Sequence, residues 1–271
     1  MDYCEHRPTG AISNIVKCFW SIGHDGNIDA PLETVLPDGC PEIVFNLADR
    51  FQKIPVFGGI ETQATAIISG QLRSRIYIRP TGRVRLFGIR FQPFGAANYL
   101  GIPMSELTDQ VLPLDSLVGE AAEEFECRIA EQNDFEGQVF VAEDTLMNNF
   151  SKTQGNTVIA ANVTERIIRT GGREPMAALC ALTGLGERRL ERIFSRYVGI
   201  SPKAFARTRR FQNVLRNLET STSYDLSDAA VSFGYYDQSH MIHEFREFSG
   251  MSPLGYFQSK HLMSDLFTAT A

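Results

Sequence analysis

"VSFGYYDQSHMIHEFREFSGMSP", residues 231–253, decides the fold of the C-terminal part of the chain. A short apolar run ends at Gly234, a polar and aromatic turn follows, and a helix-like stretch then runs to Gly250. This pattern predicts two short helices set at an angle by a glycine turn. The first turn of the second helix carries Gln, Ser and His, which a helix that only filled a core would not need.

The same unit occurs earlier in the chain, since "GLGERRLERIFSRYVGISP" (184–202) is similar to "GYYDQSHMIHEFREFSGMSP" (234–253). Leu190 and Met241, Phe194 and Phe245, Gly199 and Gly250, and Ser201-Pro202 and Ser252-Pro253 are each 51 residues apart. Apolar stretches precede both copies, at 176–182 and 226–233. The spacing predicts one helix-turn-helix unit used twice. Ser201 and Ser252 are expected N-caps, because each precedes a proline at a first helical position.

Helical periodicity separates an apolar face from a polar face in the second helix of each unit. Leu190, Ile193, Phe194 and Tyr197 share the apolar face of the first copy, and Met241, Phe245 and Phe248 share that of the second. The predicted DNA-contacting residues lie on the opposite faces or on the first turn: Arg188, Glu191, Arg192, Ser195, Gln238, Ser239, His240, Ile242, His243 and Arg246. Arginine can bond guanine bidentately, glutamine can bond adenine, and an aliphatic side chain can contact the thymine methyl group. The alternative is that these residues form an ordinary solvated face.

Residues from about 176 to 258 resemble the DNA-binding module of AraC-type (AraC/XylS) bacterial transcription regulators, most specifically over "GYYDQSHMIHEFREFSGMSPLGYFQ" (234–258). The resemblance implies that 201–218 is a long helix joining two helix-turn-helix units, with Arg210 at its middle. It also implies double-stranded DNA and RNA polymerase as partners, activation of transcription, and a cytoplasmic location. Gly186 stands where the family usually has a capping serine, and His243 stands where relatives often have arginine.

The N-terminal half is expected to be β-rich up to about residue 92 and helical from about 94. "SRIYIRPTGRVRLFGIRFQP" (74–93), for example, predicts two strands broken by Pro-Thr-Gly. The predicted fold is therefore α+β and multidomain. It comprises a β-rich domain with following helices at 1–150, a linker at 151–156, an all-α double helix-turn-helix domain at 157–260, and a tail at 261–271.

"LPDGCPEIVFNL" (36–47) and the stretch 79–114 resemble a cupin-like domain that precedes the same module in one branch of the family. The resemblance implies a sensor or dimerisation role, hence a small-molecule effector or a homodimer. Arg83 and Arg85 alternate along one strand, so they line an acidic-effector pocket or form a solvated sheet face. The aromatic residues Trp20, Phe45, Phe57, Phe87 and Phe91 line such a pocket or fill a plain core; Arg83, Arg85, Phe45 and Phe87 are the effector-binding candidates.

The composition narrows the function classes. The net charge is -6, yet residues 156–260 hold about 14 Lys and Arg against about 10 Asp and Glu, roughly +4, which suits a polyanion partner. No apolar run is long enough to cross a membrane, and the N-terminus lacks a signal-peptide layout. The five widely spread cysteines favour reduced thiols in a cytosolic protein.

No cofactor, metal site or enzymatic activity is expected. The sequence has no His-x-His pair, nucleophile elbow, Walker loop or dinucleotide fingerprint. Two metal alternatives remain: Cys4, His6 and Cys18, whose spacing matches no standard zinc site, and His240 with His243 on one helix.

The sequence therefore predicts a transcription regulator that reads two adjacent segments of DNA. A joining helix of about 17 residues would span about 25 Å, against about 34 Å between successive major-groove faces. The alternative is an effector-binding or protein-interaction module whose DNA-binding half has degenerated.

Overall fold

The computed structural model describes residues 2–24, 32–55, 59–148, 155–220 and 230–258. Several sequence-based predictions lie outside these ranges. They concern residues 151–154 of the expected linker, the tail at 261–271, Phe57, and residues 226–229 of the expected helix at 226–233.

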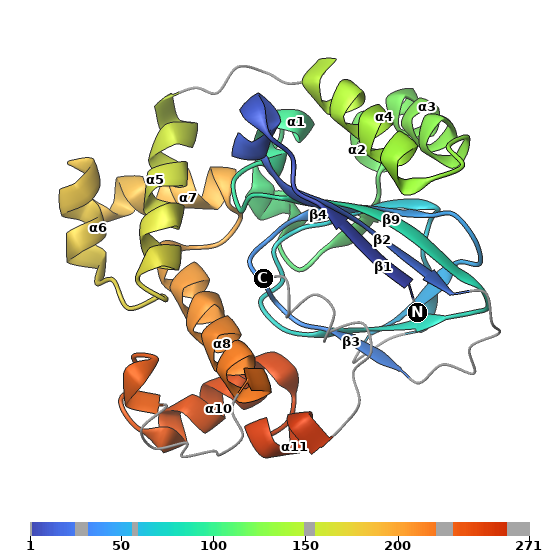
Figure 1. Ribbon diagram of the computed structural model, residues 1–271. Coiled ribbons are helices and arrows are strands. Elements are labelled where there is room, and N and C mark those ends of the chain that lie inside the picture. Colours follow the sequence, from blue (N-terminus) through green and yellow to red (C-terminus); the bar gives the residue numbers. More distant parts are fainter. Residues whose placement is uncertain (1, 25–31, 56–58, 149–154, 221–229, 259–271) are drawn as a thin grey trace.

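Two antiparallel sheets form the N-terminal part, which the sequence predicted to be β-rich (Figure 1). The first has the strand order β1-β2-β9-β4-β7-β10 and the second the order β3-β8-β5-β6. The strands are β1 (Asp2–His6), β2 (Val16–His24), β3 (Glu33–Val35), β4 (Glu42–Asn46), β5 (Phe51–Ile54), β6 (Glu61–Thr62), β7 (Ala66–Ser69), β8 (Ile76–Pro80), β9 (Val84–Phe91) and β10 (Val111–Pro113). The two strands expected around Pro-Thr-Gly are β8 and β9. Strand β10 was not expected; it follows two short helical segments and returns to pair Leu112 with Ile68 of β7.

The first sheet is buried on both faces, because its side chains alternate between two clusters. Ile43 and Phe45 of β4 join the cluster under the helices that follow the sheet. Val44 of β4 and Leu86 of β9 join a second cluster between the two sheets. The N-terminal part therefore has two apolar layers, one between sheet and helices and one between sheet and sheet.

Helices cover one face of the first sheet and make up the C-terminal part over its described residues (Figure 1). They are η1 (Gly10–Asn14), α1 (Ala96–Leu100), η2 (Met104–Leu107), α2 (Asp115–Val118), α3 (Glu120–Ala130), α4 (Phe135–Asn148), α5 (Gly155–Arg169), α6 (Met176–Thr183), α7 (Glu187–Tyr197), α8 (Pro202–Thr220), α10 (Gln238–Ser249) and α11 (Pro253–Gln258). The helices expected after residue 94 are thus present where the structure describes those residues.

The C-terminal helices repeat one local design. Helix α6 ends at Gly184, whose φ of +67° is left-handed, and Gly234 has a φ of +82° at the equivalent turn before α10. Glycine adopts this conformation without the steric cost that a Cβ would bring. Ser201 Oγ accepts from Ala204 N at 3.1 Å and Ser252 Oγ from Gly255 N at 3.2 Å, so both predicted N-caps are confirmed.

Helix α8 joins the two units and also rests on the N-terminal part. Its first half packs in a cluster with α5, α6 and α7, and its second half packs with α10 and α11. Leu36, in the loop between β3 and β4, belongs to that second cluster. Gln212 Nε2 donates to Pro37 O at 2.7 Å, and Arg209 Nη1 donates to Asp38 O at 3.4 Å. We call residues 36–40 the docking loop, because α8 contacts the β-rich part there.

Candidate nucleic-acid interface

Helix α7 presents a charged face to solvent. Its N-cap is Gly186, with Glu187 on the first turn, and this acidic residue suits the partial positive charge of a helix N-terminus. Leu190, Ile193 and Phe194 are buried among α5, α6 and α8. The predicted contact residues lie on the other side: Arg188, Glu191 and Arg192 are exposed, and Ser195 is half-buried.

Helix α10 repeats the arrangement with different polar residues. Met241, Phe245 and Phe248 are buried. Ser239, His240, His243 and Arg246 are exposed, whereas Gln238 and Ile242 are half-buried. Asp237 caps the helix, since its side chain accepts from His240 N at 2.7 Å. His240 contributes to the turn as well, because its Nδ1 accepts from Tyr236 N at 3.4 Å and its ring packs edge-on against Tyr235.

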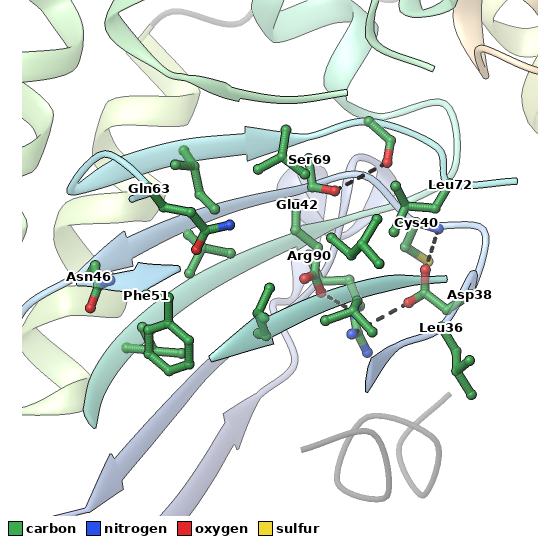
Figure 2. A pocket seen from close by; sticks show the side chains of 18 of the residues that line it. Leu36, Asp38, Cys40, Glu42, Asn46, Phe51, Gln63, Ser69, Leu72 and Arg90 are labelled. Atoms are coloured by element: carbon green, nitrogen blue, oxygen red, sulfur yellow. Dashed lines mark hydrogen bonds and ion pairs between the residues drawn. The ribbon is translucent and has the colours of Figure 1, made fainter. Parts of the chain in front are cut away.

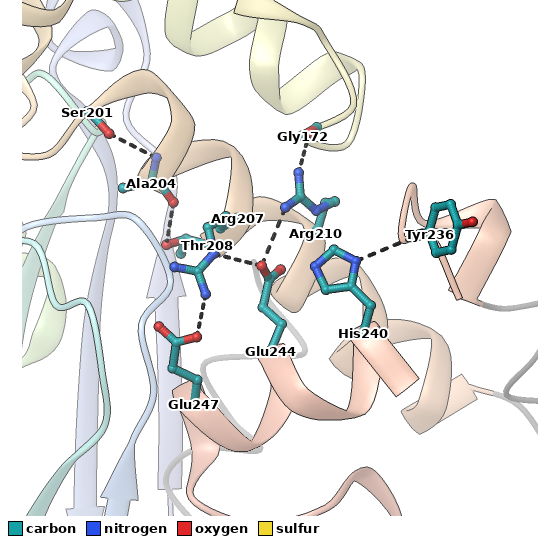
Figure 3. Close-up of polar contacts among 10 residues, drawn as sticks. All are labelled: Gly172, Ser201, Ala204, Arg207, Thr208, Arg210, Tyr236, His240, Glu244 and Glu247. Carbon is teal, nitrogen blue, oxygen red and sulfur yellow. Dashed lines mark hydrogen bonds and ion pairs between the residues drawn. The ribbon is translucent and has the colours of Figure 1, made fainter. Parts of the chain in front are cut away.

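A buried carboxylate fixes α10 on α8, as Figure 3 shows. Glu244 Oε2 accepts from Arg207 Nε at 2.7 Å and from Arg210 Nη2 at 3.5 Å. Arg207 also donates to the exposed Glu247 at 2.6 Å, and Arg210 donates to Gly172 O at 3.1 Å. Arg210 is the residue that the sequence placed in the middle of the joining helix. The four side chains set the angle between α8 and the exposed face of α10, a relationship that the sequence did not reveal.

The first helix-turn-helix unit also contacts the β-rich part. Thr108 Oγ1 donates to Gly199 O at 2.6 Å, just after α7. Pro103 and Ser105, near η2, border a shallow cleft with Arg192 and Ser195. Glu187 and Arg188, at the N-terminal end of α7, lie outside this contact with the β-rich part and are exposed.

A cavity of about 110 Å³ lies between the two sheets, and we call it the inter-sheet cavity. Its walls are mostly apolar, with Trp20, Val44, Phe51, Ile78 and Leu86 among them. Polar groups gather toward the docking loop, where Asp38, Glu42 and Arg90 meet (Figure 2). Gln212 of α8 also lines the cavity, so both halves of the chain contribute to it.

Arg90 is paired with two carboxylates inside this cavity. It is 3% exposed; its Nε donates to Glu42 Oε1 at 2.5 Å, and its Nη2 lies 3.4 Å from Asp38 Oδ2. Burial alone would lower the pKa of Arg90, but Glu42 and Asp38 outweigh it and the pKa is raised. Burial raises the pKa of Glu42, and Arg90 opposes that change. Burial likewise raises the pKa of the nearby Cys18 thiol, to about 12.

The four residues expected to bind an effector lie elsewhere. Phe45 and Phe87 are buried on the helix side of the first sheet, because they alternate with the cavity-facing residues of β4 and β9. Arg83 and Arg85 are exposed; the backbone N of Arg83 donates to Asp49 Oδ2, and Arg85 Nη2 donates to Gln132 O. The described lining of the cavity includes none of the four, and Arg90 is the arginine that it does include.

The metal alternative formed by Cys4, His6 and Cys18 does not assemble in the structure. Cys4 and His6 lie on the exposed side of β1, whereas Cys18 is buried between the sheets. Within the described ranges no group of three His, Cys, Asp or Glu side chains is placed to hold a metal ion. In the same part of the chain, every helix is too short or too polar to span a bilayer.

Both the N-terminal and the C-terminal part of the chain match known protein families. Residues 4–113 match a family described as a domain of unknown function (DUF6597), and residues 179–259 match a helix-turn-helix domain. No curated protein matches the chain.

Solved structures with a similar arrangement are distant in sequence. ToxT from Vibrio cholerae O395 shares 11% identity at a TM-score of 0.47, covering 89% of this chain and 97% of its own. Unsaturated fatty acid bound wild-type ToxT from another strain of Vibrio cholerae shares 13% at 0.44, covering 88% and 94%. The AraC-like transcriptional activator CuxR shares 13% at 0.27, covering 78% and 86%. The two family matches, and not these distant structures, identify residues 179–259 as a helix-turn-helix domain, which in this chain follows an N-terminal domain of unknown function.

Proposed function

We propose that the chain is a sequence-specific transcription regulator whose helices α7 and α10 enter two adjacent major grooves of DNA. One observation carries the proposal. Two equivalent helices, at opposite ends of α8, bury matching apolar faces and expose unlike polar faces. A shared core with different outward residues is expected of two recognition helices that read different base sequences.

The exposed residues supply the chemistry of base recognition. Arg188 and Arg192 lie one turn apart on α7 and can each donate two hydrogen bonds to a guanine. At the equivalent positions α10 has Ser239 and His243, which make single contacts, so the second segment should be read less strictly. Glu191, Ser195, Gln238, His240, Ile242 and Arg246 complete the proposed interface. Of these, His240 has one ring nitrogen already engaged by Tyr236 N, which leaves Nε2 for DNA.

The domain boundaries and partners are part of the same proposal. Residues 1–150 form the sensor or dimerisation domain, and the DNA-binding domain extends from the start of α5 to about residue 260. The cluster formed by α5, α6, α7 and the first half of α8 supports this boundary, because few of its members lie outside the C-terminal part. The resemblance to AraC-type regulators supports activation, contact with RNA polymerase, a cytoplasmic location and a homodimer. We propose the inter-sheet cavity as the effector site, in place of Arg83, Arg85, Phe45 and Phe87.

A mobility-shift titration of the full chain against the DNA upstream of its own coding region tests the proposal. We expect a specific complex that is weakened by Arg188→Ala with Arg192→Ala and, to a lesser degree, by Ser239→Ala with His243→Ala. Arg169→Ala, which removes an exposed charge from α5, is the control and should have little effect. Binding that falls equally in all three variants, or no binding to this or genomic DNA fragments, would favour the degenerate-module alternative.

A further inference from the structure

The lining of the inter-sheet cavity has more acidic than basic side chains at its polar end, while the guanidinium of Arg209 lies outside that lining and donates to Asp38 O. Arg90 is the only Lys or Arg among the described residues that line it, and Asp38 and Glu42 are the only carboxylates. Both carboxylates are paired with that single guanidinium. An incoming anion would have to displace one of them from Arg90, whereas a cation meets a surplus of acceptor oxygens.

Two acceptor oxygens in the lining of the cavity, one on Asp38 and one on Gln212, lack a hydrogen-bond donor. Asp38 Oδ1 accepts from Cys40 N at 2.9 Å, but the buried Oδ2 lies only in ion-pair range of Arg90 and accepts no hydrogen bond. Gln212 is 2% exposed; its Nε2 donates to Pro37 O, and its Oε1 has no partner. A buried acceptor without a donor is destabilising, so such groups normally have a partner in the protein, an ordered water or a ligand.

The two acceptors belong to different halves of the chain. Asp38 is in the docking loop of the β-rich part, and Gln212 is on α8, yet both line the same cavity. The rest of the lining is largely hydrocarbon, and the volume of about 110 Å³ is somewhat below that of an engineered cavity that binds benzene. The space thus suits a molecule of about five or six heavy atoms with one polar end.

We propose that the inter-sheet cavity binds a small aliphatic or aromatic ammonium compound. Its ammonium group donates to Asp38 Oδ2 and Gln212 Oε1, while its hydrocarbon part packs against Val44, Phe51 and Leu86. The ligand therefore joins the docking loop to α8.

A regulatory consequence rests on the proposed DNA-binding function. Because α8 carries a recognition helix at each end, a ligand that holds α8 against the docking loop favours one placement of those helices relative to the β-rich part. Linkage then requires that the ligand and DNA change each other's affinity by the same factor.

The first test is a titration of the full chain, without DNA, by calorimetry and ligand-observed NMR. The probes are isobutylammonium and isobutyrate, which have similar carbon skeletons and opposite charge. We expect isobutylammonium to bind at least tenfold more tightly than isobutyrate. Equal binding, tighter binding of isobutyrate, or no binding of either probe would overturn the assignment.

Three variants locate the binding. Asp38→Asn keeps the size of the side chain and removes its charge, and should weaken isobutylammonium at least tenfold. Asp49→Asn removes the same charge from an exposed loop outside the cavity lining and should leave binding unchanged. Val44→Phe should abolish binding by filling the space; because it can disturb folding, each variant is first compared with the parent by circular dichroism and thermal unfolding. Retained binding in a folded Val44→Phe protein would overturn the site.

The second test concerns regulation and has its own outcome. Mobility shifts are repeated at saturating isobutylammonium, with sodium chloride at equal ionic strength as the reference. A change in DNA affinity of at least threefold, absent in Asp38→Asn, supports the coupling; an unchanged affinity overturns it. Failure to bind DNA under any condition refutes the proposed function alone, because the probe titration does not use DNA.

Discussion

Arg207 of α8 donates to Glu244 of α10 across 2.7 Å, and Glu244 is only 3% exposed. Arg210 of α8 reaches the same oxygen, so one buried carboxylate holds two guanidinium groups in the joint between the helices. This joint fixes the orientation of α10 relative to α8.

Glu244→Ala should destabilise the second helix-turn-helix unit, because it leaves Arg207 and Arg210 without their buried partner. We expect a loss of about 2–4 kcal/mol in the free energy of unfolding, given that Arg207 remains partly solvated. Glu247→Ala removes the exposed partner of Arg207 and should cost at most about 1 kcal/mol. Urea unfolding followed by circular dichroism measures both, and equal losses would show that burial of Glu244 contributes nothing.

Arg192→Ala should weaken binding to the specific site by about 1–3 kcal/mol if Arg192 contacts a guanine. Binding to unrelated DNA should change much less, since the lost contact is with a base. Fluorescence anisotropy with specific and random duplexes at one salt concentration measures the two affinities. An equal loss on both duplexes would make Arg192 a phosphate contact.

One protomer should protect two short base clusters about one helical turn apart. Helix α8 has 19 residues and is therefore about 28 Å long, so the units at its two ends can reach successive major grooves. The clusters should differ in sequence, because Arg188 and Arg192 have Ser239 and His243 as counterparts. Footprinting with a fragment of residues 155–271, shown to be folded first, removes any contribution from dimerisation. Protection of a single cluster would mean that one unit is structural, and we expect that unit to be the one with His243.

Cys18 should make the fold sensitive to alkaline pH. Burial raises the pKa of its thiol from 9.0 to about 12, so its neutral form stabilises the folded state fully below about pH 9. That contribution is lost as the pH rises from 9 toward 12. Between pH 8 and 10.5 the parent should lose about 2 kcal/mol more than Cys18→Ala. Urea titrations at the two pH values give the double difference, and parallel losses would contradict the prediction.

The sequence correctly predicted the buried and exposed residues of elements that have one face in the core and one face in water. Helices α7 and α10 have a polar face and an apolar face, so their buried and exposed residues follow from the 3.6-residue period. Their 51-residue spacing also holds in the structure, where α7 begins at Glu187 and α10 at Gln238. The two strands around Pro-Thr-Gly were predictable for a related reason, since the breaker marks where pairing must stop.

The sequence did not identify the residues that line the inter-sheet cavity, because β4 and β9 are buried on both faces. Along such strands apolar residues run almost continuously, and the sequence does not say which set faces the second sheet. Phe45 and Phe87 were chosen from one set, whereas the cavity is lined by the other, with Val44, Leu86 and Arg90. Gln212 was not predictable at all, because a polar residue on a helix is expected in solvent unless a distant segment covers it.

The hydrogen bond from Gln212 to Pro37 joins residues 175 positions apart, which constrains how the protein is made. At about 5–20 residues per second, a ribosome needs roughly 10–35 s to add the intervening chain. During that interval Leu36 has been made, but the helix that will cover it does not yet exist. The nascent chain therefore carries an uncovered apolar loop, and the newly made protein passes through a state in which Asp38 and its neighbours are open to water before α8 closes over them.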